Sequence, residues 1–124
     1  MQVFFDRRKA RSNIAEEALS LQLTASATRA GAQSMVLADD HGLVIAHTGD
    51  AKDADELAAF SPYLASHHPW VGSIRCQNGQ HQVAISPFAL RNGRAYLCAV
   101  GGKTTRMGSA FLHATAGIRR ILAP

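Results

Sequence analysis

Six histidines and two cysteines are the residues whose chemistry could make this chain a metal-binding protein or an enzyme. None of the histidines occurs in H-E-x-x-H or in a similar pair on one helical face; they are His41, His47, His67, His68, His81 and His113. The cysteines, Cys76 and Cys98, are too far apart for a C-x-x-C zinc pair and too few for a disulfide framework. The sequence therefore predicts no metal site and two buried free thiols.

Nucleophilic or nucleotide chemistry would need groupings that the sequence does not supply. Neither cysteine stands beside a histidine and an acid, and no serine lies in a G-x-S-x-G elbow. Gly102-Lys103-Thr104 imitates the end of a P-loop, but the first glycine of that motif would fall at Leu97, inside a predicted strand. We expect Thr104 or Thr105 to cap a helix instead. We therefore assign no catalytic residue and no cofactor.

The composition is that of one globular domain. With 124 residues, 47% of them hydrophobic, the chain can bury a core without metals or disulfides. Its formal net charge of +4 is concentrated near the two ends, at Arg7, Arg8, Lys9, Arg11, Arg119 and Arg120. No aromatic residues interleave with these charges, so we expect solvated basic ends rather than a nucleic-acid or lipid site.

The first residues carry no targeting pattern. The apolar stretch at residues 1–5 precedes the charges, which is the reverse of a secretory signal, and no apolar run approaches the ~18 residues of a membrane span. We expect a cytoplasmic protein. Residues 1–12 are predicted to be a disordered basic segment, and residues 13–124 a single domain.

Two short apolar runs flank Asp39-Asp40-His41-Gly42, where the chain should reverse tightly. Gly42 adopts a positive φ freely, and Asp and His tolerate left-handed backbone. The pattern predicts paired antiparallel strands over Gln33–Ala38 and Leu43–Thr48.

A short helix is predicted directly after this hairpin. Asp53 is placed to cap its free N–H groups, and Asp55 and Glu56 lie in its first turn, where the helix dipole favours negative charge. Pro62 lacks a donor and clashes with the carbonyl four residues back, so we expect the helix to bend there. The predicted buried stripe consists of Leu57, Phe60 and Leu64.

A longer helix is predicted before the hairpin, from a capping box at Asn13 and Glu16 to about Ala30. Its main apolar face consists of Ile14, Ala18, Leu21 and Ala25. Leu19 and Leu23 fall on a different side, so a second apolar surface must meet a neighbouring helix or a partner.

The second half of the chain is predicted to form three strands and a helix. The strands cover Val71–Gln77, Gln80–Arg91 and Arg94–Val100, joined by turns at Asn78-Gly79 and Asn92-Gly93. Pro87 implies a bulge or bend in the second of them. The helix is marked by apolar residues at helical spacing as far as about Leu122, namely Met107, Phe111, Ala114, Ile118 and Ile121. The element order is α-β-β-α-β-β-β-α, and an uncovered sheet edge and helix surface favour a binding function.

With these elements in place, the chain resembles the roadblock family, the dynein-light-chain type of domain also found in bacterial regulators of small GTPases. The resemblance spans about residues 13–122. It rests on the segments Val36–Ala46, Glu56–Pro62, Tyr96–Val100 and Ala116–Leu122. It implies an α+β fold, a profilin-like α/β/α sandwich. A five-stranded antiparallel sheet of order 2-1-5-4-3 would carry the first and last helices on one face and the central helix on the other.

The resemblance also implies a homodimer. The strand over residues 71–77 would lie at an edge and pair with its copy across a two-fold axis, giving a continuous ten-stranded sheet. The implied dimer interface consists of Val71, Ser73, Ile74, Arg75, Cys76 and Gln77. Cys76 would lie near the axis, roughly 10 Å from Cys98 across two ladder spacings, beyond the reach of a disulfide at about 7 Å.

Roadblock proteins act as scaffolds or bind Ras-like GTPases, so the resemblance implies a non-catalytic adaptor or regulator. The partner surface would lie on the paired central helices, at the outward residues Asp55, Glu56, Ala59 and Tyr63. Stimulated GTP hydrolysis would call for an arginine finger, and the sequence favours neither Arg75 nor Arg91 for that role.

Two other functions stay open at this point. The first is a ligand-sensing domain of related α/β/α shape, with a pocket between the sheet and the central helix lined by Phe60, Trp70 and Tyr96. The second is an enzyme, for which the sequence offers no catalytic grouping. The pair His67-His68 could also sense pH or bind a partner, or simply be an exposed loop.

Overall fold

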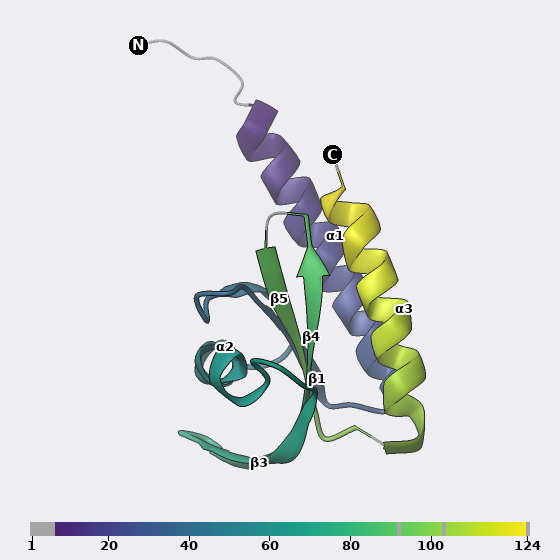
Figure 1. Cartoon of the computed structure of the whole chain (residues 1–124). Coiled ribbons are helices and arrows are strands. Elements are labelled where there is room, and N and C mark those ends of the chain that lie inside the picture. Colours follow the sequence, from purple (N-terminus) through teal and green to yellow (C-terminus); the bar gives the residue numbers. More distant parts are fainter. Residues whose placement is uncertain (1–6, 92, 103, 124) are drawn as a thin grey trace.

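Five strands form one antiparallel sheet with helices on both faces (Figure 1). The computed structural model describes residues 7–91, 93–102 and 104–123. The elements in chain order are α1 (Arg7–Ala30), β1 (Ser34–Ala38), β2 (Val44–His47), α2 (Ala51–Leu64), β3 (Trp70–Cys76), β4 (Gly79–Leu90), β5 (Gly93–Val100) and α3 (Thr104–Leu122). The strand order is β2-β1-β5-β4-β3, so the predicted element order, sheet order and fold class are confirmed.

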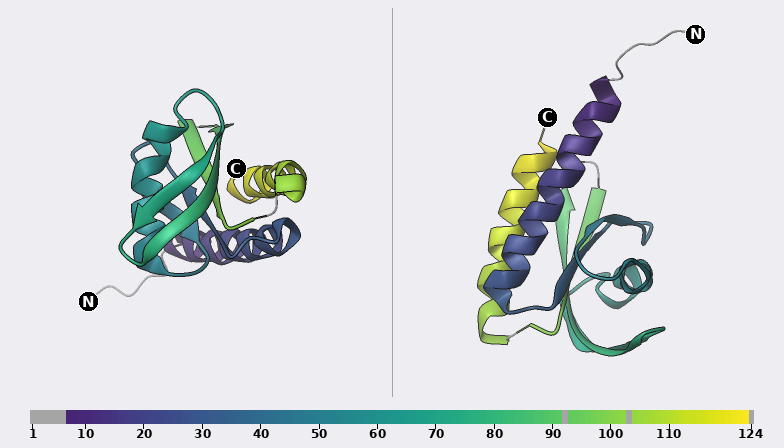
Figure 2. Two further views of the ribbon diagram at one scale, coloured as in Figure 1. Left: turned by 90° about the horizontal axis from the view of Figure 1, so that it is seen from below. Right: turned by 180° about the vertical axis from the view of Figure 1, so that it is seen from behind.

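The two faces of the sheet are covered by different helices, with α1 and α3 on one side and α2 on the other (Figure 2). Alternation along the central strands explains this, because successive side chains point to opposite faces. In β5, Leu97 packs in the core with α1 and α3, while its neighbours Tyr96 and Cys98 pack in the core beneath α2. The strand is buried on both sides, and the sheet separates two apolar cores.

Helices α1 and α3 lie side by side on their face of the sheet (Figure 1). Gly117 allows this approach, since a Cβ there would lie 2.1 Å from Oε1 of Gln22 on α1. The predicted main face of α1 is wrong: Leu19 and Leu23 are buried, whereas Leu21 is exposed. Both stripes have helical spacing, and the position of α3 decides which of them is covered.

Helix α2 starts and packs differently from the prediction. Its N-cap is Asp50 rather than Asp53, and the Asp50 side chain accepts a hydrogen bond from the backbone N–H of Asp53 at 2.9 Å. The helix runs through Pro62 to Leu64. Phe60 does not belong to the buried stripe, because it faces outward; the buried residues are Ala54, Leu57, Ala58 and Ser61.

The β3–β4 hairpin differs from the prediction in its turn and at its proline. Cys76 pairs with Gly79, so the loop residues between β3 and β4 are Gln77 and Asn78, and Gly79 follows the turn instead of forming its centre. No bulge occurs at Pro87, which pairs with Tyr96 in an unbroken register. Strand β3 begins at Trp70, which pairs with Ile85, so β4 has no neighbour on that side beyond Ile85. Proline is tolerated on such an unpaired side of a strand.

The start of α1 also differs from the prediction. The helix begins at Arg7, not at Asn13, so residues 7–12 of the predicted disordered segment are helical, and residues 1–6 lie outside the described residues. The division into this segment and a domain over residues 13–124 otherwise stays a prediction. Lys103 also lies outside the described residues. Within the described part of the chain, no helix is both long enough and apolar enough to cross a membrane.

Candidate functional site

Strand β3 is an open edge of the sheet. It pairs with β4 only, so the backbone groups on its other side face away from the sheet, ready to pair with another strand. Its side chains alternate: Ile74 and Cys76 are buried on the α2 face, and Val71, at 75% exposure, lies uncovered on the opposite face. The remaining predicted interface residues Ser73, Arg75 and Gln77 are exposed.

The outer surface of α2 carries two aromatic rings. Tyr63 is 85% exposed and Phe60 is 42% exposed, and their spacing of three residues places them on one side of the helix. Asp55 and Ala59 are also exposed, as predicted for the outward surface. The sequence analysis missed Phe60 because it assigned the residue to the core. Its position one turn before Tyr63 was the available signal.

Glu56 does not belong to this outward surface. Its carboxylate accepts a hydrogen bond from the backbone N–H of Gln77, with oxygen–nitrogen distances of 3.0 and 3.1 Å. The residue is half-buried, and it ties α2 to the turn that follows β3. Glu56 therefore holds the edge strand against the helix.

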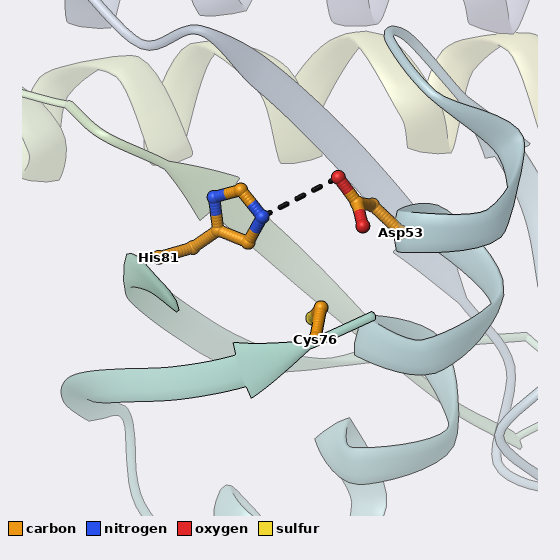
Figure 3. A group of neighbouring side chains, drawn as sticks. All are labelled: Asp53, Cys76 and His81. Atoms are coloured by element: carbon orange, nitrogen blue, oxygen red, sulfur yellow. Dashed lines mark ion pairs between the residues drawn. The ribbon is translucent and has the colours of Figure 1, made fainter. Parts of the chain in front are cut away.

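Three side chains from α2, β3 and β4 converge beside this contact: Asp53, Cys76 and His81 (Figure 3). Nε2 of His81 lies 3.3 Å from Oδ2 of Asp53. One ligand atom from each of the three residues lies within 4.8 Å of the other two. Among the described residues, this group has the side chains that could hold a metal ion.

Both thiols are free and buried, as predicted. Burial raises the pKa of Cys76, and the nearby carboxylates of Glu56 and Asp53 raise it further. Burial also raises the pKa of Cys98 to about 12, with a smaller contribution from Cys76. Neutral thiols are poor nucleophiles, so neither cysteine is prepared for catalysis.

These three residues are not neighbours in any known motif, so their spacing in the sequence did not predict the group. The hairpin accounts for two of them: Cys76 pairs with Gly79 and Ile74 pairs with His81, so Cys76 and His81 lie diagonally on one face. The predicted turn at Asn78-Gly79 would have placed Cys76 directly opposite His81, which also puts the two side chains on one face. The arrival of Asp53 above them depends on how α2 packs, which no local pattern specifies.

A cavity of about 190 Å³ opens next to the group, and Asp53 and His81 both line it. Its other walls include the start of α2 and strand β1, through Asp50, Leu57 and Val36. The three residues predicted to line a ligand pocket do not line this cavity. Phe60 lies on the outer surface and Tyr96 is buried in the core, so neither lines this cavity; the same holds for Trp70.

The fold is that of roadblock proteins. MglB from Myxococcus xanthus superimposes with a TM-score of 0.60 at 11% identity, covering 97% of this chain and 93% of that one. The gliding protein MglB from Thermus thermophilus gives 0.59 at 16% identity, with 96% and 93% covered. A Roadblock/LC7 domain from Streptomyces avermitilis gives 0.63 at 17% identity, with 85% and 98% covered.

Sequence comparison adds nothing to this likeness, because no protein-family model and no curated protein matches the chain. At these identities the structural likeness establishes the fold and leaves the activity open. It covers nearly the whole chain, so the three helices and the sheet all belong to the shared architecture.

Proposed function

We propose that this protein is a non-catalytic homodimeric adaptor of the bacterial roadblock type, which binds and regulates a Ras-like small GTPase in the cytoplasm. The observation that carries the proposal is the combination of the longer edge strand, β3, with exposed aromatic rings on α2, the helix that packs beside it. The fold shared with MglB supports it, because the roadblock resemblance implies regulators of small GTPases.

The dimer is proposed to form at β3. Pairing of the two β3 edges would satisfy the backbone groups that this strand leaves open, and it would continue the sheet through a two-fold axis. Because α2 lies on the face next to β3, the same pairing would bring the two α2 helices into one surface. Each partner-binding surface would then contain residues of both copies.

The GTPase is proposed to contact Tyr63, Phe60, Ala59 and Asp55. Aromatic residues are enriched among the residues that contribute most to protein interfaces, and an exposed ring such as Tyr63 has no role in the core. Glu56, the remaining residue of the predicted surface, is engaged with Gln77 and acts indirectly, by holding β3 in place. We assign no residue to GTP hydrolysis, since Arg75 and Arg91 are both exposed and no geometry selects one of them.

The alternative of a small-molecule sensor receives less support. The cavity beside α2 measures about 190 Å³, whereas pockets for drug-sized ligands measure about 300–1,000 Å³. Trp70 fluorescence in a metabolite screen separates the two functions, because a sensor would respond to a small molecule and the adaptor would not.

The proposal is tested by binding of Ras-like GTPases from the source organism, loaded with GDP or with a non-hydrolysable GTP analogue. Loss of an aromatic anchor costs about 2 kcal/mol or more, so Tyr63→Ala should weaken binding about 30-fold. Leu112→Ala is the matched control, because Leu112 is 74% exposed on α3, on the other side of the sheet. Equal binding by Tyr63→Ala and the wild type would refute the α2 surface, and absence of binding to every such GTPase would refute the function.

A further inference from the structure

We propose that Asp53, Cys76 and His81 form a binding site for a divalent transition-metal ion, with Zn²⁺ as the best fit. The site joins the first turn of α2 to the β3–β4 hairpin (Figure 3). It does not rest on the proposed adaptor function, because all three side chains come from one copy of the chain.

The ligand chemistry favours zinc. Thiolate, imidazole and carboxylate are its usual protein ligands, whereas Mg²⁺ and Ca²⁺ prefer oxygen alone. At Zn–N and Zn–O distances of about 2.0–2.1 Å, a tetrahedral site separates the nitrogen and oxygen ligands by about 3.4 Å. The observed distance between Nε2 of His81 and Oδ2 of Asp53 is 3.3 Å. These two ligands are already spaced for one ion, and the sulfur of Cys76 lies within 4.8 Å of one ring nitrogen of His81 and one carboxylate oxygen of Asp53.

A second observation is the state of the polar atoms at the site. Within the described residues, Nε2 of His81 and Oδ1 of Asp53 are buried without a hydrogen-bond partner. The histidine and the carboxylate are close, yet the contact between them is not a hydrogen bond. A buried polar atom without a partner costs about 1–3 kcal/mol. A metal ion bound by Nε2 of His81 would remove that cost for the histidine.

The ligands are held by rigid elements. The backbone N–H of Asp53 is bound by the N-cap Asp50, which fixes the first turn of α2. Cys76 and His81 sit on paired strands, on the same face, at positions set by the hairpin register. Such preorganisation reduces the entropy lost when an ion binds.

The cavity beside the site supplies both an entry path and a fourth ligand. Asp53 and His81 line it, and its volume of about 190 Å³ is large enough for several water molecules. Three protein ligands would leave one tetrahedral position for water, an arrangement known from zinc sites that keep an open position. Binding would fasten α2 to the edge hairpin and displace the proton of the Cys76 thiol.

The test uses untagged, reduced full-length protein, freed of metal with EDTA and then dialysed. Titration with Zn²⁺ in a calorimeter should show one ion per chain. Co²⁺ in place of Zn²⁺ should give a thiolate-to-cobalt charge-transfer band, which reports directly on Cys76. Both Cys76→Ser and His81→Gln should weaken Zn²⁺ binding by about 100-fold or more, since loss of even an outer partner of a metal site costs about 10–100-fold.

The matched controls are Cys98→Ala, which removes the other cysteine, and His41→Gln, which removes an exposed histidine of the β1–β2 turn. Both should bind Zn²⁺ like the wild type. Circular dichroism checks that each variant is folded. If Cys76→Ser is not folded, Asp53→Asn replaces it as the second ligand variant. Absence of binding, a cobalt spectrum without the thiolate band, or binding unchanged by His81→Gln and Asp53→Asn would overturn the proposal.

Discussion

Replacing Val71 by aspartate should dissociate the proposed dimer without unfolding the chain. Val71 is 75% exposed on β3, so the single chain loses little when it is changed. Full burial of a valine contributes about 1.5–3 kcal/mol. If a paired strand covers about half of the exposed part, each copy contributes about 1 kcal/mol to the dimer, and the two copies contribute about 2 kcal/mol. The dissociation constant should therefore rise about 30-fold.

Light scattering and sedimentation over a dilution series measure this constant. The wild type should have about twice the chain mass of 13.3 kDa at high concentration, and Val71→Asp should reach the single-chain mass at a higher concentration than the wild type does. The matched control is Leu112→Asp, with the same charge introduced at a residue of 74% exposure on α3. A wild type that stays monomeric would refute edge pairing. So would a dimer that Leu112→Asp weakens and Val71→Asp leaves unchanged, since it would place the interface on the helical face.

Three further predictions concern stability, each measured by urea denaturation. Asp50→Ala should lower the free energy of unfolding by about 1 kcal/mol through loss of the α2 N-cap, and no change would mean that another group caps the helix. Gly108→Ala should raise it by about 0.5–1 kcal/mol, because nothing lies within 4 Å of the added Cβ, whereas Gly117→Ala should lower it through collision with Gln22; equal effects would contradict this packing. The pKa of Cys98 is raised from 9.0 to about 12 in the folded chain, so the unfolded chain loses its proton first, and stability should fall between pH 9 and 12. With EDTA present, the loss should be about 1.4 kcal/mol at pH 10 and smaller in Cys98→Ala; an equal loss in that variant would rule out Cys98 as its source.

The elements predicted correctly are those governed by local patterns. The turn at Gly42 formed as expected, with a φ of +77° that glycine adopts without strain. The open edge at β3 was inferred from the family resemblance, and the observed sheet order confirms it. The exposed positions of Asp55 and Tyr63 also agree with the prediction, while their role in binding a partner stays a prediction.

The errors arise where two local patterns compete. Along α1, the stripe that includes Leu21 and the stripe that includes Leu23 have the same period, and contact with α3 and with the sheet selects the second. At the start of α2, Asp50 and Asp53 could both cap the helix, and the observed bond from the Asp53 N–H to Asp50 decides between them. Phe60 was assigned to the core because it continues the helical spacing of Leu57 and Leu64, and such spacing does not decide which side of a helix faces the sheet.

By itself, the sequence determined the element order and the chain reversal at Gly42, because these depend on residues a few positions apart. Only the tertiary structure decided that Glu56 holds the edge strand and that Asp53 meets Cys76 and His81. Those contacts join residues more than 20 positions apart, and they exist because α2 packs across the sheet at one particular place. The position of α2 on the sheet is set by how their whole apolar faces fit together, and the spacing of residues along the sequence does not predict that fit.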